Sequence, residues 1–317
     1  GATVVESIPV GDARVSIASD SVVTVNPANN LPGSAAITVS IPNGAFRDFS
    51  GNPDVAVTWA FRTADEMALA HPVLHSSRDR RVPLLAIVNR MDEAGIEAEI
   101  DGLLAEGYRT LKIKVGFDRA SDARRVRMTQ RLVAGKGVAL TIDANQGYSQ
   151  EDGVRFAAEL DPQDVLFFEQ ACHKDDWRAA VAVAKAATTP VMLDESIYDI
   201  GDVERAASLG CARYVKLKLM KCGGLDSLRQ AIERARALGL EPVMGNGVAT
   251  HIGCWMEACI AAETITTAGE MNGFLKPDRA LVSNPLPVVE GAIVVPAGYV
   301  PRLDDDALDA CTIDRRD

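Results

Sequence analysis

The sequence has few aromatic residues, few histidines and no long apolar run. Phe, Trp and Tyr make up 5% of the 317 residues, and there are 4 histidines. No apolar stretch reaches the roughly 18 residues that a membrane-spanning helix needs, so we expect no membrane partner. The N-terminus lacks the basic and apolar regions of a signal peptide, which favours a cytoplasmic location.

A basic surface and paired cysteines are also lacking. The 33 Lys and Arg residues are outnumbered by 44 Asp and Glu residues, which gives a net charge of −11. A nucleic-acid partner would require a basic face, so this class of protein is excluded. The 6 cysteines include no C-x-x-C pair. They predict reduced thiols in place of a zinc site or a disulfide framework.

The composition changes near residue 64. Residues 1–64 contain neither Lys nor Cys, and short alternating runs such as A-A-I-T-V-S-I are separated by turn clusters such as F-S-G-N-P. This pattern is typical of a small all-β segment. We assign residues 65–81 to a linker, residues 82–280 to an α/β domain and residues 281–317 to a C-terminal extension.

The α/β domain alternates apolar strands with helical stretches. Eight strands are expected, at about 83–88, 110–115, 138–143, 165–169, 190–194, 213–218, 241–245 and 264–268. Each strand except the last is followed by a helix, which predicts a (β/α)7β TIM-like barrel. An open doubly wound sheet is the alternative. The barrel is preferred because there are eight strands and no glycine-rich dinucleotide fingerprint follows the first.

Two strands carry pairs of lysines although lysine is scarce in the chain. Lys112 and Lys114 lie in T-L-K-I-K-V-G, and Lys216 and Lys218 lie in Y-V-K-L-K-L-M. Alternation places both members of each pair on one face of the strand. The two strands are the second and the sixth, which stand on opposite sides of an eight-stranded barrel. Lys114 and Lys218 are then expected at its C-terminal mouth, where barrel enzymes place their chemistry.

The third, fourth and fifth expected strands each end in an acidic residue. Asp143, Glu169 and Asp194 are separated by 26 and 25 residues, about one strand–helix repeat each. Three neighbouring carboxylates repel one another unless a cation lies among them, and an all-oxygen ligand set suits Mg²⁺, with Mn²⁺ as the alternative. Any one of these acids could be a helix cap, but three in register favour a metal site.

These motifs together resemble the enolase superfamily, in its muconate-lactonising branch. The resemblance rests on K-I-K, I-D-A-N-Q-G-Y, F-F-E-Q, L-D-E-S and L-K-L-M-K-C-G-G, and it covers about residues 80–280. It implies a racemase, epimerase, dehydratase or cycloisomerase. Asp143, Glu169 and Asp194 would bind the metal, and Lys114 and Lys218 would be the paired acid and base.

The resemblance also implies a mechanism. A proton next to the carboxylate of a small substrate would be removed to give an enediolate that Mg²⁺ stabilises. The base must be a neutral lysine, and we expect Lys112 to tune Lys114. Asn145 and Glu195 are expected to orient ligands or lysines, and Glu270 to contact the substrate. Lys216 departs from the family pattern. The mandelate racemase branch of the superfamily uses a histidine as base, and His251 could take that role. Its position several residues after the strand favours a histidine at the start of a helix instead.

The N-terminal segment is the main departure from the family. The family's barrel is preceded by an α+β capping domain, whereas residues 1–64 resemble part of a bacterial Ig-like module and only residues 65–81 could be a cap remnant. We therefore expect an open mouth and impaired turnover, with residues 280–317 poorly packed or covering either the barrel or the Ig-like segment.

Three functions stay open at this point, and a homo-oligomer is compatible with all of them. The first is racemisation or epimerisation of an amino-acid derivative, including proline-like imino acids. The second is dehydration or cycloisomerisation at the same site. The third is a non-catalytic Ig-like fusion whose barrel is a scaffold.

Overall fold

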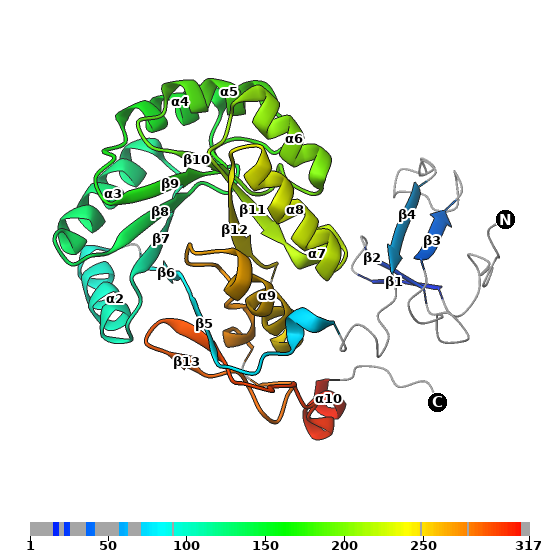
Figure 1. The fold of residues 1–317 in the computed structure, drawn as a ribbon. Coiled ribbons are helices and arrows are strands. Elements are labelled where there is room, and N and C mark those ends of the chain that lie inside the picture. The colour runs from blue at the N-terminus through cyan, green and yellow to red at the C-terminus, as the bar shows by residue number, and fades with distance from the viewer. Residues whose placement is uncertain are drawn as a thin grey trace. The chain divides into compact units, whose positions relative to one another are not determined.

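A computed structural model describes residues 71–311, apart from residues 91, 248 and 278, and the backbone of four strands nearer the N-terminus (Figure 1). The chain divides into two compact units, Gly1–Pro72 and Val73–Asp317. Among the described helices, none combines the length and the apolar character that crossing a membrane requires.

The first unit contains two antiparallel strand pairs. β1 (Val15–Ala18) pairs with β2 (Val22–Val25), and β3 (Ala36–Ile41) pairs with β4 (Val57–Arg62). β2, β3 and β4 fall in alternating runs that predict β structure, whereas β1 precedes the first of these runs. The remaining residues of 1–64 lie outside the described residues, and the Ig-like assignment stays a prediction.

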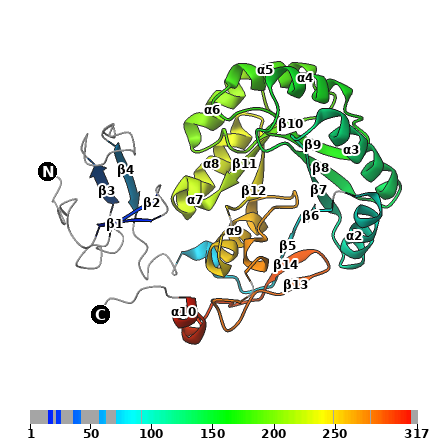
Figure 2. The ribbon, with the colours of Figure 1, turned by 180° about the vertical axis from the view of Figure 1, so that it is seen from behind.

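The second unit contains a curled parallel sheet of seven strands in the order β12-β11-β10-β9-β8-β7-β6. Its strands are β6 (Ala86–Val88), β7 (Thr110–Lys114), β8 (Ala139–Asp143), β9 (Val165–Glu169), β10 (Val191–Leu193), β11 (Tyr214–Lys218) and β12 (Glu241–Gly245). The connecting helices are α2 (Glu93–Ala105), α3 (Arg119–Val133), α4 (Gln150–Glu159), α5 (Trp177–Ala186), α6 (Ile200–Leu209), α7 (Leu219–Cys222), α8 (Leu225–Ala237) and α9 (His251–Thr264). The long helices from α2 to α8 lie outside the curve of the sheet (Figures 1 and 2). This is the predicted α/β, TIM-like architecture.

The barrel closes through two residues that belong to no regular strand. Gly269 forms a parallel bridge with Leu84, and Glu270 forms one with Gly245 at the end of β12. The strand predicted at 264–268 is wrong by a few residues, because α9 continues to Thr264 and pairing begins only at Gly269. The eighth barrel position is therefore short, and it places Glu270 beside the end of β12.

Side-chain alternation divides each strand between two packing environments. Outward-facing residues such as Leu111, Ile142 and Phe168 are buried in the main core, beneath the helices. Inward-facing Phe167, Met192 and Val243 form a second, smaller cluster. Because side chains point to the same face at every second residue, the residues two positions after these three, Glu169, Asp194 and Gly245, also face inward. The interior is thus apolar at one level and charged at the next.

The helices from α2 to α6 begin at polar caps. The side chains of Asp92, Asp118, Ser149, Asp176 and Asp199 each accept a hydrogen bond from a backbone N–H in the first turn of α2, α3, α4, α5 and α6 respectively. Each cap satisfies a donor that the helix leaves unpaired. The caps fix where each strand–helix loop ends, and these loops follow the strand ends that carry the lysines and acids.

The C-terminal segment packs on the barrel unit. β13 (Val288–Val289) and β14 (Ala292–Val295) form a hairpin, and β14 pairs antiparallel with β5 (Arg80–Pro83). Ile293 and Val295 are buried in the main core. The described part of residues 280–317 is therefore packed against the barrel unit, which is one of the outcomes expected for it. The short helix α10 (Asp305–Cys311) follows. Residues 80 and 81, expected in the linker, are part of β5.

Candidate functional site

The lysines and acids predicted from the sequence lie together at the C-terminal ends of the barrel strands. β7 ends at Lys114, β8 at Asp143, β9 at Glu169 and β11 at Lys218. Lys114 is paired in register with Asp143, and Asp143 with Glu169. Parallel strands end at one edge of the sheet, so residues far apart in the sequence share one rim.

Lys114 is held at this rim by two side chains. Its Nζ donates to Asp143 Oδ2 at 2.7 Å and to Asn145 Oδ1 at 2.6 Å. The Asn145 amide donates in turn to Glu195 Oε1 at 3.2 Å, and its backbone N–H donates to Asp143 Oδ1. Asn145 and Glu195, predicted as orienting residues, therefore connect the loops that follow β8 and β10, the strands on either side of β9. Lys114 remains 31% exposed, which leaves its amine accessible from outside the barrel.

The charged side chains at the C-terminal ends of the barrel strands contact one another and are called the charged layer: Lys112, Lys114, Asp143, Glu169, Asp194, Lys216, Lys218 and Glu270. Glu169 contacts two of its lysines. Its side chain is fully buried and is contacted by two buried lysines, with Lys112 Nζ 2.8 Å from Oε2 and Lys216 Nζ donating to Oε1. The geometry at Oε2 is that of an ion pair without a hydrogen bond, so this oxygen has no hydrogen-bond partner. Oε2 of Glu169 is therefore held by an ionic contact alone, whereas Oε1 also accepts a hydrogen bond.

Asp194, which follows β10, pairs with the lysines of the sixth barrel strand and the helix after it. Lys218 Nζ lies 2.8 Å from Oδ1, and Lys221 Nζ lies 3.1 Å from the same oxygen. Lys216 Nζ is more distant, at 3.6 Å from Oδ2. Lys218 is thus paired with one predicted ligand and Lys114 with another, in matching positions on opposite strands.

Glu270, at the eighth barrel position, has two buried lysines as partners of its carboxylate. A substrate contact was expected, but Oε2 accepts hydrogen bonds from Lys112 at 2.7 Å and from Lys216 at 2.8 Å, and the side chain is only 15% exposed. Closure of the barrel beside Gly245 directs this carboxylate inward. Oε2 is therefore engaged by two ammonium groups, and the predicted contact of Glu270 with a substrate stays a prediction.

Burial shifts the pKa of each group in this layer towards its uncharged form, and the neighbouring charges decide the direction of the net pKa shift. Burial alone would lower the pKa of Lys112, but Glu169 and the other carboxylates raise it above its ordinary value. For Asp143, burial is outweighed by Lys112 and Lys216, so its pKa is lowered. Burial together with the Asp143 charge raises the pKa of Glu169 to about 7. Lys112 is therefore held as an ammonium ion.

The donor set suits a hard divalent cation in its chemistry. Asp143, Glu169 and Asp194 supply carboxylate oxygens only, and Glu169 Oε2 lacks a hydrogen-bond partner. Within the part of the chain that the structure describes, however, no three acids, histidines or cysteines already converge on one point. The ammonium groups of Lys112 and Lys216 lie between the carboxylates instead. The residues fit Mg²⁺ or Mn²⁺ by type, and the lysines compete for the same oxygens.

Two residues of this region were missed by the sequence reasoning. Lys221 donates to the backbone and side chain of Asp194, and it follows Lys218 by one helical turn. Glu257 on α9 is 1% exposed and accepts from the backbone N–H of Leu219, next to Lys218. Burial raises the pKa of Glu257 to about 8. An acid in the middle of the apolar stretch G-C-W-M-E-A-C-I is the signal that could have indicated it.

His251 begins a helix, as the helix-start interpretation expects. It is the first residue of α9, and its ring packs 5.2 Å from that of Phe274. Burial lowers the pKa of His251.

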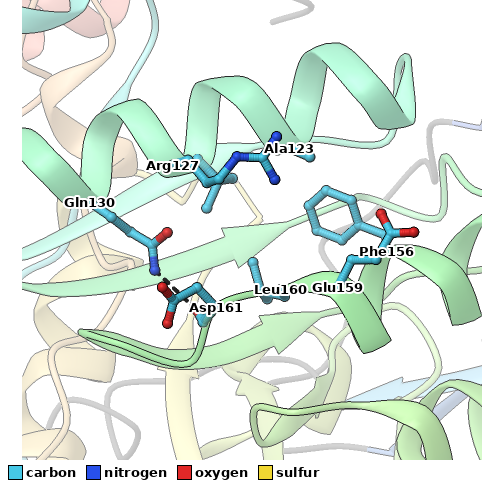
Figure 3. A pocket seen from close by; sticks show the side chains of 8 residues that line it. Ala123, Arg127, Gln130, Phe156, Glu159, Leu160 and Asp161 are labelled. Atoms are coloured by element: carbon cyan, nitrogen blue, oxygen red, sulfur yellow. Dashed lines mark hydrogen bonds between the residues drawn. The ribbon is translucent and has the colours of Figure 1, made fainter.

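Two cavities among the described residues lie elsewhere. One has a volume of about 10 Å³, space for a single water molecule. It is lined by residues of α3 and α4 and of the loop after α4, with Gln130 bonded to the backbone of Asp161 (Figure 3). The other, about 340 Å³, lies beside β5 and β14, where Glu290 accepts from Arg81. Neither is lined by a lysine or acid of the charged layer.

Comparison with known proteins gives epimerases and a racemase among the relatives of this chain. The L-Ala-D/L-Glu epimerase of Bacillus subtilis is 33% identical over 178 residues, 55% of this chain and 48% of that protein. A hydrophobic dipeptide epimerase of Roseobacter litoralis is 31% identical over 201 residues, 62% of this chain and 56% of that protein. An N-succinyl-L-Arg/Lys racemase of Bacillus cereus is 26% identical over 196 residues, 61% and 53% of the two chains. The chain spans about half the length of these curated relatives.

Solved structures show the same fold. Muconate cycloisomerase from Pseudomonas fluorescens superposes with a TM-score of 0.70 at 22% identity, covering 75% of this chain and 68% of that one. The substrate-liganded L-Ala-D/L-Glu epimerase from Bacillus subtilis superposes with a TM-score of 0.64 at 26% identity, covering 73% and 64%. These proteins are isomerases of the enolase superfamily, whose members generally use Mg²⁺.

The family assignment rests on the barrel itself. The sequence model described as Enolase C-terminal domain-like matches residues 95–299, which include every strand from β7 to β12. The match covers well over half of the chain, and the fold and the relatives agree with it. The chain belongs to the Enolase C-terminal domain-like family.

Proposed function

We propose that this chain carries the catalytic barrel of a Mg²⁺-dependent racemase or epimerase acting on an amino-acid derivative. The reacting atom is the carbon next to a free carboxylate, and the substrate class is a dipeptide or an N-acylated amino acid. Support for this class comes from the relatives, which are named dipeptide epimerases and an N-succinyl amino-acid racemase.

The observation that carries the proposal is the placement of two lysines on opposite walls of the barrel. Lys114 ends β7 and Lys218 ends β11, four strands apart in the sheet order. A substrate between them presents one face of its α-carbon to each amine. Inversion at that carbon requires a base on one face and an acid on the other, and two opposed lysines supply both.

The proton balance of the reaction is simple. The neutral amine of one lysine takes the α-proton, so the C–H bond breaks and an N–H bond forms. The ammonium group of the other lysine then gives a proton to the opposite face of the same carbon. No net proton is gained or lost, and the two lysines exchange roles when the other stereoisomer is the substrate.

Asp143, Glu169 and Asp194 would hold the metal ion, for which Mg²⁺ is the first choice and Mn²⁺ the alternative. When bound, the ion supplies positive charge that stabilises the substrate carboxylate as the α-proton leaves. Two of these acids also contact the two proposed catalytic lysines: Asp143 contacts Lys114, and Asp194 contacts Lys218. The metal ligands would therefore hold both lysines at the same rim of the barrel. Asn145 orients Lys114 through its amide oxygen.

The experiment is exchange of substrate α-protons in deuterated water. The full chain would be incubated with MgCl2 and a library of dipeptides and N-acyl amino acids, and deuterium incorporation read by mass spectrometry. We expect Mg²⁺-dependent exchange with at least one compound and retention of that exchange in Lys174→Met, a control lysine on the surface. No exchange with any compound would leave the barrel as a scaffold and end the proposal.

A further inference from the structure

Lys216 places a positive charge in the interior of the barrel. It is the middle residue of β11 and faces inward between Tyr214 and Lys218, and it is 1% exposed. Its Nζ donates to Glu169 Oε1 and to Glu270 Oε2, and lies 3.6 Å from Asp194 Oδ2. Two of these three acids belong to the proposed metal-ligand set.

The barrel has space for this side chain because of a glycine on the neighbouring strand. Gly245 ends β12, and a Cβ built there would lie 2.6 Å from Lys216 Cδ and 2.8 Å from Cγ. Such contacts are too close for any side chain, so the alkyl stem of Lys216 occupies the volume that a residue larger than glycine would need. The position of the ammonium group is therefore fixed by packing as well as by charge.

Glu270 balances the charge that Lys216 adds. Its Oε2 lies within hydrogen-bond distance of both Lys112 and Lys216. With Glu270 included, the four acids of the layer are Asp143, Glu169, Asp194 and Glu270. They are already paired with five ammonium groups, those of Lys112, Lys114, Lys216, Lys218 and Lys221. A divalent cation that enters this layer therefore meets carboxylates whose negative charge is already neutralised by lysine ammonium groups.

We propose that Lys216 is a built-in cation that occupies the interior of the carboxylate cluster and weakens the binding of divalent metal ions by this chain. Its ammonium group uses the oxygens of Glu169 and Asp194 that a metal ion would use, and it repels a second cation at close range. Metal binding then requires the Lys216 side chain to leave these oxygens. The inference rests on the proposed function only in taking Asp143, Glu169 and Asp194 as the ligand set.

A consequence for folding follows from the same contacts. Three mutually repelling carboxylates usually need a bound cation to be stable together. Here Lys112 and Lys216 supply that charge from within the chain, so the folded barrel gains less from added metal. We therefore expect the melting temperature of the wild type to be nearly the same in MgCl2 and in EDTA.

The test compares metal binding by the full chain and three variants, with MgCl2 as the probe in titration calorimetry and MnCl2 in electron paramagnetic resonance. Lys216→Met keeps the length of the stem beside Gly245 and removes the charge. The double variant Lys216→Met/Glu270→Gln also removes the acid that Lys216 balances, in case the single variant does not fold. Lys174→Met, on the surface, is the control for loss of one positive charge.

We expect both Lys216 variants to bind Mg²⁺ at least about tenfold more tightly than the wild type and the control. We also expect their melting temperatures, unlike that of the wild type, to rise with added MgCl2. Equal affinity in all four proteins would overturn the inference, and so would an absence of binding in all four. Deuterium exchange is scored separately: tighter metal binding without exchange would support Lys216 as the built-in cation while ending the proposed function.

Discussion

Lys112 and Glu270 meet inside the barrel, with Nζ 2.7 Å from Oε2, although 158 residues separate them in the sequence. The contact joins β7 to the residue that closes the barrel beside β12. It also links two fully buried lysines, because the same oxygen accepts from Lys216. Glu270 therefore acts as a structural counter-charge within the barrel.

Glu270→Gln should destabilise the fold. The substitution keeps the size of the side chain but leaves two buried ammonium groups with one anionic partner fewer. Breaking a buried ion pair on one side typically costs about 3–5 kcal/mol. The free energy of unfolding would be measured with urea. Glu263→Gln is the control, because Glu263 pairs with Arg80 and Arg229 near the surface and should lose less than about 1 kcal/mol. Equal losses in both variants would contradict the structural role.

Replacing either rim lysine should separate the two stereoisomers of a substrate. In Lys218→Met, Lys114 can still remove the proton from its own face, so one stereoisomer should exchange its α-proton without being inverted. Lys114→Met should show the opposite preference. Racemisation should fall by about 10²–10⁴-fold in both, the usual contribution of an acid or base. Nuclear magnetic resonance in deuterated water follows both reactions, and loss of exchange from the same stereoisomer in both variants would refute two opposed bases.

Glu257 should make the stability of the wild type depend on pH. Its pKa is raised from 4.5 to about 8 by burial, so the folded state holds a proton that the unfolded state releases above pH 4.5. This contribution is fully present below about pH 4.5 and is lost as the pH rises to about 8. Its slope is at most about 1.4 kcal/mol per pH unit.

Glu257→Gln removes this titration, so the free energy of unfolding of the wild type should fall relative to the variant between pH 5 and pH 8. Urea unfolding at several pH values measures both. Glu233→Gln, a substitution on α8 outside this region, is the control and should follow the wild type. Parallel curves for the wild type and Glu257→Gln would show that Glu257 is ionised in the folded state.

Local alternation along the sequence is enough to predict most of the barrel. Period-2 runs locate the strands from β6 to β12, and the acids and lysines at their ends follow from the spacing. The eighth barrel position is predicted too early, at 264–268, since Ile265 and its neighbours have the composition of a strand. The structure extends α9 to Thr264 and pairs Gly269 and Glu270 instead. Closure of the sheet selects these residues: Gly269 pairs with Leu84 at the start of the barrel, and Glu270 pairs with Gly245 at the end of β12.

The sequence by itself determined which residues face the interior and which ends of the strands share a rim, because both depend on the two-residue period of a strand and on parallel connections. The sequence left open which lysine pairs with which acid inside the barrel. Glu270 turns inward to two lysines, and Lys216 fills the space beside Gly245, only because the barrel closes on itself. Which lysine contacts which acid depends on the distances between side chains across the barrel interior, and no local pattern of residues encodes these distances.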